Sequence, residues 1–284
     1  MGQILQVIIN SISLSLIYVL FASGLTLIMG IFDVCNFAYG EFVMAAAFVS
    51  WLIVKVGGLP YFLAPIAAMG VVSVIGIIFE KAMFYPMRHR GGLEPALATF
   101  GSASMLSGIA LIVWGGMPKG VPPIMSGQLQ IGSASLQLAK VPIIAGALVM
   151  ILLLFLFVQR TKLGLAIRAL QQDQDAAALQ GMNIATTRVV VWVVASCLAA
   201  VDGILLASIS YVDPFVGTGL LLKGFAVVIM GGMGSIPGAL VGGFALGFVD
   251  SFGQTYIGTA SYMFAFGFII LVLILRPQGL LGKR

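Results

Sequence analysis

The sequence has few charged residues. Only 8% of its 284 residues are Asp, Glu, Lys or Arg, and 61% are hydrophobic. Soluble globular domains carry roughly 25% charged residues. So few charges cannot cover the water-exposed surface of a chain this long, which excludes a soluble fold. We therefore expect a protein embedded almost entirely in the lipid bilayer.

Residues that usually carry chemistry are also scarce. His89 is the one histidine, and Cys35 and Cys197 stand in apolar runs without paired spacing. We expect no metal site, disulfide, bound cofactor or catalytic residue, and hence no enzyme. No G-x-x-x-x-G-K-[ST], G-x-S-x-G or H-E-x-x-H stretch occurs. The net charge of +5 is spread over short clusters, which does not indicate a nucleic-acid partner.

Long apolar runs make up most of the chain, and a spanning helix needs about 20 such residues. The runs predict an all-α polytopic bundle in a single transmembrane domain, residues 1–284. Val141 to Val158 shows no alternation, which excludes a transmembrane barrel. About nine helices are expected, with a range of eight to ten, near 4–29, 37–54, 61–80, 95–114, 141–158, 187–211, 219–232, 236–252 and 257–275.

The positive charges predict an orientation. With nine crossings, ten of the fourteen basic residues fall on one side, which the positive-inside rule makes cytoplasmic. The N-terminus is then outside and the C-terminus inside. The cytoplasmic set is Lys81, Arg88, Arg90, Arg160, Lys162, Arg168, Arg188, Arg276, Lys283 and Arg284, and the outer set is Lys55, Lys119, Lys140 and Lys223.

Two long loops differ in composition. Residues 115–140 are rich in Gly, Pro and Ser and predict an irregular external loop with a short hairpin around Leu129–Leu136. Residues 160–186 contain many helix formers and no Pro, and Gly181 stands where a helix would end. This cytoplasmic region is predicted to form one helix or two short ones. It is either a solvated connector or a docking helix for another protein.

Two apolar segments are interrupted, near 30–41 and near 231–237. Both begin Ile-Met-Gly and then break at Gly, Asp, Asn or Pro. Corresponding interruptions in two halves of a membrane protein indicate a transport site. The backbone groups that they free must be buried in protein or line a cavity, since lipid cannot bond them.

Several polar residues lie at membrane depth, where an ionisable group is a functional candidate. Asp33 and Glu41 either belong to such a site or end helices at the interface. Asp202 and Asp250 are expected to face the interior and to pair with Thr, Ser or Gln. Small residues at Gly234, Gly238, Gly242, Gly243 and Gly247 predict one flat helix face, with packing inside the chain favoured over a subunit interface.

Four stretches resemble one known family. They are Val34-Cys-Asn-Phe-Ala-Tyr-Gly-Glu-Phe, Thr161-Lys-Leu-Gly-Leu-Ala-Ile-Arg-Ala, Lys223-Gly-Phe-Ala-Val-Val-Ile-Met-Gly-Gly-Met-Gly-Ser-Ile-Pro-Gly-Ala and Leu275-Arg-Pro-Gln-Gly-Leu-Leu-Gly. Together they resemble the branched-chain amino-acid permease family of ABC importers, and specifically the shorter of its two permease subunits. Tyr39 stands where family members commonly carry His. The substrate therefore stays open among branched-chain or other neutral amino acids, amides, urea and aromatic acids.

The resemblance implies a permease subunit of a bacterial inner-membrane importer. Its partners would be a homologous second permease in a heterodimer, two cytoplasmic ATPases that bind the ATP, and a periplasmic substrate-binding protein. The interrupted segments would line the substrate path with Asn36, Phe37, Gly40, Glu41, Gly231, Gly232, Gly234, Ser235 and Pro237. The region 160–182 would contact an ATPase as the coupling helix, with Leu163, Arg168, Asp173, Ala177 and Gly181.

Three other functions compete with this reading. An ion-coupled secondary transporter would use Asp33, Asp202 or Asp250 to carry a proton. A membrane-embedded enzyme would turn over a substrate without moving it. A purely structural subunit would tolerate loss of Arg168 without any effect on transport.

Overall fold

A computed structural model describes residues 2–87, 93–125, 127–131, 134–258, 261–276 and 278–282. Arg88, His89, Arg90, Lys283 and Arg284, on which part of the orientation prediction depends, lie outside the described residues. The helices are α1 Gly2–Phe32, α2 Tyr39–Trp51, α3 Leu63–Phe79, α4 Leu93–Trp114, α5 Lys140–Arg160, α6 Lys162–Gln172, α7 Gln174–Leu179, α8 Ile184–Ala207, α9 Val216–Gly231, α10 Ile236–Tyr256 and α11 Ser261–Leu275. The π-helical turns η1 Leu52–Val56 and η2 Glu80–Phe84 extend α2 and α3.

The predicted helical bundle is confirmed. Seven helices in the described part of the chain are long and apolar enough to cross a membrane, and two shorter apolar helices are Val216–Gly231 and Ala265–Leu275. Each of the nine predicted segments coincides with one observed helix. At 1.5 Å per residue, the 16 residues of α9 span about 24 Å, less than the roughly 30 Å hydrocarbon core.

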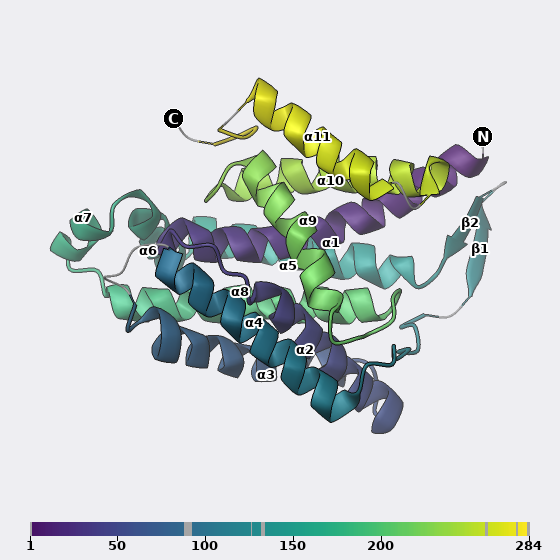
Figure 1. The fold of residues 1–284 in the computed structure, drawn as a ribbon, viewed down its shortest axis with the longest axis horizontal. Helices are drawn as coiled ribbons and strands as arrows, with labels where there is room; N and C mark the ends of the chain where they lie inside the picture. The colour runs from purple at the N-terminus through teal and green to yellow at the C-terminus, as the bar shows by residue number, and fades with distance from the viewer. Residues whose placement is uncertain are drawn as a thin grey trace.

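Helix α1 is the central helix of the bundle. Of its spanning window, 89% is buried, and it packs against α10, α8, α9 and α5. In Figure 1 it runs horizontally through the molecule with α10 and α11 above it. A helix that is apolar all round is expected in such a buried position. By contrast, only 17% of the window in α4 and 22% of that in α5 are buried, so these two helices lie at the periphery.

Glycines bring α10 into close contact with its neighbours. A Cβ on Gly247 would lie 2.4 Å from the Cα of Ser15, and one on Gly243 would lie 2.9 Å from the backbone N of Val19. Small residues of this kind let helix backbones approach. The predicted packing inside the chain is therefore observed for the flat face of α10.

The two ends of the bundle carry different connections. The N-terminus and the hairpin β1 Gln128–Ile131 and β2 Ala134–Gln137 lie at one end, whereas α6, α7 and the C-terminus lie at the other (Figure 1). The strands pair antiparallel, with Leu129 opposite Leu136, as predicted for this loop. Lys119 of the same loop pairs with Val212 after α8.

Lys223, which was counted with the outer set of basic residues, forms an ion pair inside the bundle. Lys223 lies in the middle of α9, where its Nζ is 2.6 Å from Asp250 Oδ2 of α10. Lys223 Nζ also donates to the Tyr18 hydroxyl of α1 at 2.8 Å, and that hydroxyl donates to the same carboxylate oxygen at 2.5 Å. Asp250 does face the interior, but it is bonded to Lys and Tyr rather than to Thr, Ser or Gln. The charge on Lys223 is compatible with membrane depth because this carboxylate neutralises it.

Candidate functional site

The first interruption follows the end of α1 and turns back into the bundle. Asp33 is exposed and has a φ of 51°. The backbone N–H of Phe37 donates to Thr99 Oγ1 of α4 at 3.1 Å, and that of Ala38 donates to Asn36 Oδ1 at 3.0 Å. Protein groups therefore bond the freed backbone, as a break in a membrane helix requires.

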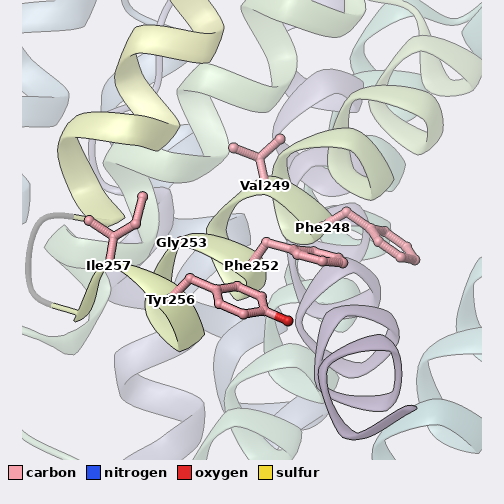
Figure 2. A pocket seen from close by; sticks show the side chains of 6 residues that line it. All are labelled: Phe248, Val249, Phe252, Gly253, Tyr256 and Ile257. Atoms are coloured by element: carbon pink, nitrogen blue, oxygen red, sulfur yellow. The ribbon is translucent and has the colours of Figure 1, made fainter. Parts of the chain in front are cut away.

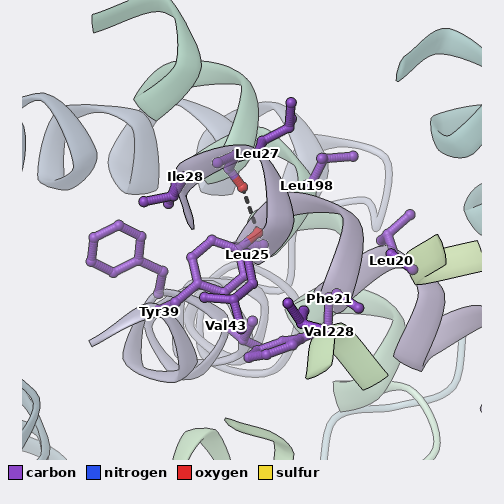
Figure 3. Packing of buried hydrophobic residues seen from close by; sticks show 14 of the residues in the cluster. Leu20, Phe21, Leu25, Leu27, Ile28, Tyr39, Val43, Leu198 and Val228 are labelled. Carbon is purple, nitrogen blue, oxygen red and sulfur yellow. Dashed lines mark hydrogen bonds between the residues drawn. The ribbon is translucent and has the colours of Figure 1, made fainter. Parts of the chain in front are cut away.

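The first residue of helix α2, Tyr39, lies in the interior of the bundle rather than at one end of the bundle. The Tyr39 hydroxyl donates to the carbonyl of Ala195, in the middle of α8, at 2.9 Å. Tyr39 is fully buried, and Figure 3 shows its ring among Phe21, Leu25 and other core side chains. The residue that departs from the family pattern is thus a core residue in this conformation.

The first turn of α2 lies against the first turn of α9. A Cβ on Gly40 would lie 2.3 Å from the carbonyl oxygen of Gly217, and a Cβ on Gly217 would lie 2.4 Å from the carbonyl oxygen of Gly40. The next residue, Glu41, is 2% exposed, and its Oε1 accepts a hydrogen bond from Thr218 Oγ1 at 3.4 Å. Phe37 contacts Phe225 of α9 at a ring-centroid distance of 5.1 Å. The first interruption therefore borders α9 over several residues.

The second interruption joins α9 to α10 in a tight turn. Gly232 and Gly234 have φ values of 104° and 79°, which only glycine adopts readily. Ser235 caps α10, since its Oγ accepts from the Gly238 N–H at 3.1 Å, and Pro237 occupies the first turn. A Cβ on Gly231 would lie 2.3 Å from the Gly238 carbonyl oxygen. The two helices thus meet without side chains between them.

The two interruptions meet at Gly30, near the end of α1. A Cβ on Gly30 would lie 3.3 Å from the Cα of Gly234 and 2.7 Å from Nε2 of Gln171 in α6. One backbone position therefore borders the second interruption on one side and the 160–186 region on the other. Asn36 and Glu41 do not reach this junction through any contact recorded in the described residues.

The 160–186 region forms two short helices, as one of the predicted alternatives. Thr161 Oγ1 caps α6 by accepting from the Gly164 N–H at 2.9 Å. Asp173 Oδ1 caps α7 by accepting from the N–H groups of Asp175 and Ala176, each at 2.9 Å. The Gln174 side chain donates to the carbonyl of Ile31, at the end of α1. The caps fix both helices, and Gln174 ties them to the first interruption.

The predicted coupling residues differ in exposure. Leu163 is 41% exposed, whereas Ala177 is buried in the core. Arg168 Nη1 donates to Gln159 Oε1 at 3.4 Å, and Gly181 has a φ of 77° after α7. Leu179 was not predicted, yet it is 88% exposed. Leu163 and Leu179 are therefore both accessible on the surface of this region.

A segment near the C-terminus also contacts the second interruption. The N–H groups of Leu280 and Leu281 donate to the carbonyls of Met230 and Gly231 at 2.7 and 3.0 Å. A Cβ on Gly232 would lie 2.5 Å from the Gly282 nitrogen. This contact was not predicted, although the segment belongs to one of the four family-like stretches. It satisfies carbonyls that the end of α9 leaves free.

The remaining carboxylate candidates do not gather into one site. Asp33 is exposed, Asp250 is bonded to Lys223, and Asp202 is buried in α8. Neither carboxylate oxygen of Asp202 has a hydrogen-bond partner in the described part of the chain. In the same residues no group of three His, Cys, Asp or Glu side chains could hold a metal ion.

A pocket of about 340 Å³ lies away from both interruptions. It is lined by the C-terminal half of α10 and the residue after it, with Phe248, Val249, Phe252, Gly253, Tyr256 and Ile257 (Figure 2). Nearly all of its lining is apolar. Because α10 crosses the membrane, such a hollow on its surface suits lipid chains, and it is not part of the candidate site.

Comparisons with known proteins show the family of the chain. The family model for the branched-chain amino acid transport system permease component matches residues 7–275. The chain is 29% identical to the high-affinity branched-chain amino acid transport system permease protein LivH of Escherichia coli K12, over 98% of this chain and 96% of that protein. It is also 29% identical, with the same coverage, to BraD, described likewise, of Pseudomonas aeruginosa.

A solved structure shows the same fold at low sequence identity. PsaBC from Streptococcus pneumoniae, in complex with Fab, superposes with a TM-score of 0.52 and 12% identity, covering 95% of this chain and 91% of that one. This likeness concerns the fold alone. With the family match over nearly its whole length, the chain belongs to the branched-chain amino acid transport system permease family.

Proposed function

We propose that this permease forms the translocation path of an ATP-driven importer for branched-chain or related small neutral amino acids. The junction at Gly30 carries the proposal, because it joins the 160–186 region to both interruptions. LivH and BraD are named as high-affinity branched-chain amino acid permeases, which supports the substrate class. The path is lined by Asn36, Phe37, Gly40, Glu41, Gly231, Gly232, Gly234, Ser235 and Pro237.

Partner subunits supply the energy and select the substrate. A homologous second permease completes the path, two ATPases bind α6 and α7, and a periplasmic protein delivers the substrate to the opposite end. Exposed Leu163 and Leu179 support the docking of an ATPase at α6 and α7. The end of the bundle with α6, α7 and the C-terminus then faces the cytoplasm, and the N-terminus faces outward.

Movement of the docked ATPases reaches the path through short contacts. Gln171 lies beside Gly30, and Gln174 donates to the Ile31 carbonyl. A displacement of α6 and α7 therefore acts directly on the end of α1 and on the turn that contains Gly234. Closure of the ATPases on ATP changes access to the path through these contacts.

Reconstitution in vesicles tests the function. The permease is assembled with the ATPases, second permease and binding protein encoded beside it, and uptake of labelled leucine is measured with ATP on the ATPase side. Uptake should require ATP and the binding protein and should persist with an uncoupler. Uptake abolished by the uncoupler at constant ATP would identify an ion-coupled carrier instead. Uptake of urea, an amide or an aromatic acid but not of leucine would overturn the substrate class.

Arg168 provides a test of coupling within the same assay. Arg168→Ala should leave ATP hydrolysis without transport, or should release the ATPases, since the side chain lies between α6 and the end of α5. Hydrolysis, uptake and subunit stoichiometry are measured on the same preparation. Normal coupled transport by this variant would contradict the assignment of α6 as the coupling helix.

A further inference from the structure

We propose that the carboxylate of Glu41 is the subsite that receives the ammonium group of an amino-acid substrate, at the meeting of α2, α4 and α9. The proposal rests on the proposed function and adds the substrate group that this residue recognises. The proposal does not depend on the roles of the other path residues.

The geometry places Glu41 where three helices meet. Because Gly40 and Gly217 are in backbone contact, the first turns of α2 and α9 lie side by side in the interior. The Thr218 hydroxyl of α9 donates to Glu41 Oε1 at 3.4 Å. The Ser107 side chain of α4 lies beside the same carboxylate. The carboxylate is thus oriented by hydroxyl groups from two separate helices.

The charge of this carboxylate is not matched inside the chain. Glu41 is 2% exposed, and its Oε2 is buried and has no hydrogen-bond partner within the described ranges. In the same ranges no Lys, Arg or His forms an ion pair with Glu41, whereas the buried carboxylates of Glu80 and Asp250 pair with Arg188 and Lys223. A buried carboxylate is costly unless a partner bonds it. A cationic group from outside the chain would satisfy it.

The protein surface begins directly beside this buried carboxylate. Thr218 is exposed, and Gly108 of α4 and Gly219 of α9 have open space where a side chain would lie. A ligand could therefore approach the helix surface closely at these two glycines. The apolar side chains of Leu111 and Leu222 are exposed on the same two helices. A zwitterion with an aliphatic side chain therefore finds an acceptor for its ammonium group and an apolar surface nearby.

The test compares leucine with its 2-hydroxy analogue, 2-hydroxy-4-methylpentanoate, in which a hydroxyl replaces the ammonium group. Each is added to the purified complex of both permeases and both ATPases, without binding protein, and the thermal unfolding midpoint is recorded over a range of concentrations. Leucine should stabilise the wild-type complex and the analogue should not. In Glu41→Gln, the leucine concentration that gives the same rise in the unfolding midpoint should be about 10-fold higher or more. This is the change expected for losing a charge-assisted hydrogen bond.

Two variants make the outcome specific. Glu41→Asp keeps the charge and should retain part of the leucine effect. Glu80→Gln removes another buried carboxylate, one that pairs with Arg188 at 3.8 Å, and should leave the preference for leucine over the analogue unchanged. Equal stabilisation by leucine in wild type and in Glu41→Gln would overturn the proposal.

Transport separates this inference from the proposed function. If the wild-type importer takes up leucine with ATP but Glu41→Gln does so at the same maximal rate, the subsite is wrong and the function stands. If wild type shows no ATP-dependent uptake, the function itself fails. A stabilisation by Na⁺ or K⁺ alone that Glu41→Gln abolishes would assign the carboxylate to an inorganic cation and would also overturn the proposal.

Discussion

Lys223 Nζ and Asp250 Oδ2 lie 2.6 Å apart inside the bundle and join α9 to α10. The Asp250 side chain is fully buried, and the Tyr18 hydroxyl of α1 bonds to both partners. The charge pair thus connects the two helices on either side of the second interruption, and Tyr18 links both of them to the central helix α1. Each charge is tolerated at this depth because the other is present.

Breaking this pair on one side should be more harmful than removing both charges. Lys223→Met or Asp250→Asn leaves one buried group without its partner, which costs about 3–5 kcal/mol. The double variant should recover most of that loss, since neither charge remains. Denaturant unfolding of the purified complex gives the unfolding free energy of the wild type, the two single variants and the double variant. Losses that add in the double variant would show that the two residues do not interact.

Gln174 is expected to transmit movement rather than to hold the fold. Gln174→Ala removes the donor to the Ile31 carbonyl and should lower leucine uptake about 5-fold at an unchanged rate of ATP hydrolysis, as expected for one lost hydrogen bond. Gln172→Ala, an exposed position on α6, is the matched control and should transport normally. Uptake and hydrolysis that fall together in Gln174→Ala would indicate loss of assembly instead.

The contact between α10 and α1 should not accept a side chain. Gly247→Ala would bring a Cβ within 2.4 Å of the Ser15 backbone and should destabilise the protein by about 1–3 kcal/mol. Gly70→Ala on α3 has nothing within 4 Å of the new Cβ and should be neutral or slightly stabilising. The unfolding midpoints of the two variants give the comparison. A neutral Gly247→Ala would mean that the helices can separate freely here.

Tyr39 should affect stability and not substrate choice. Tyr39→Phe removes the hydrogen bond to the Ala195 carbonyl and should cost about 1 kcal/mol of unfolding free energy. The ring is buried among core residues, so uptake of leucine relative to other neutral amino acids should stay the same. Competition assays in vesicles measure this ratio. A changed preference would place Tyr39 in the substrate path during transport.

The apolar runs were sufficient to predict the seven described helices that are long and apolar enough to cross a membrane, because the bilayer requires continuous hydrophobic stretches. Composition likewise predicted the hairpin, and it predicted one helix or two short ones in the 160–186 region. The pairing of Lys223 with Asp250 could not be predicted, since the two residues lie on different helices and only packing brings them together. Gly40 and Gly217 lie in opposite halves of the sequence, so their contact and the surroundings of Glu41 could be found only from the structure.

The central position of α1 has a consequence for biogenesis. Helix α1 is synthesised well before α8, α9 and α10, which cover most of it. Until those later helices enter the bilayer, the glycine-lined faces that bury α1 do not exist. Helix α1 therefore remains in contact with lipid until α8, α9 and α10 are inserted, and the native core forms only after α10 has been synthesised. Variants that slow the insertion of α10 should accordingly expose α1 to membrane quality-control proteases.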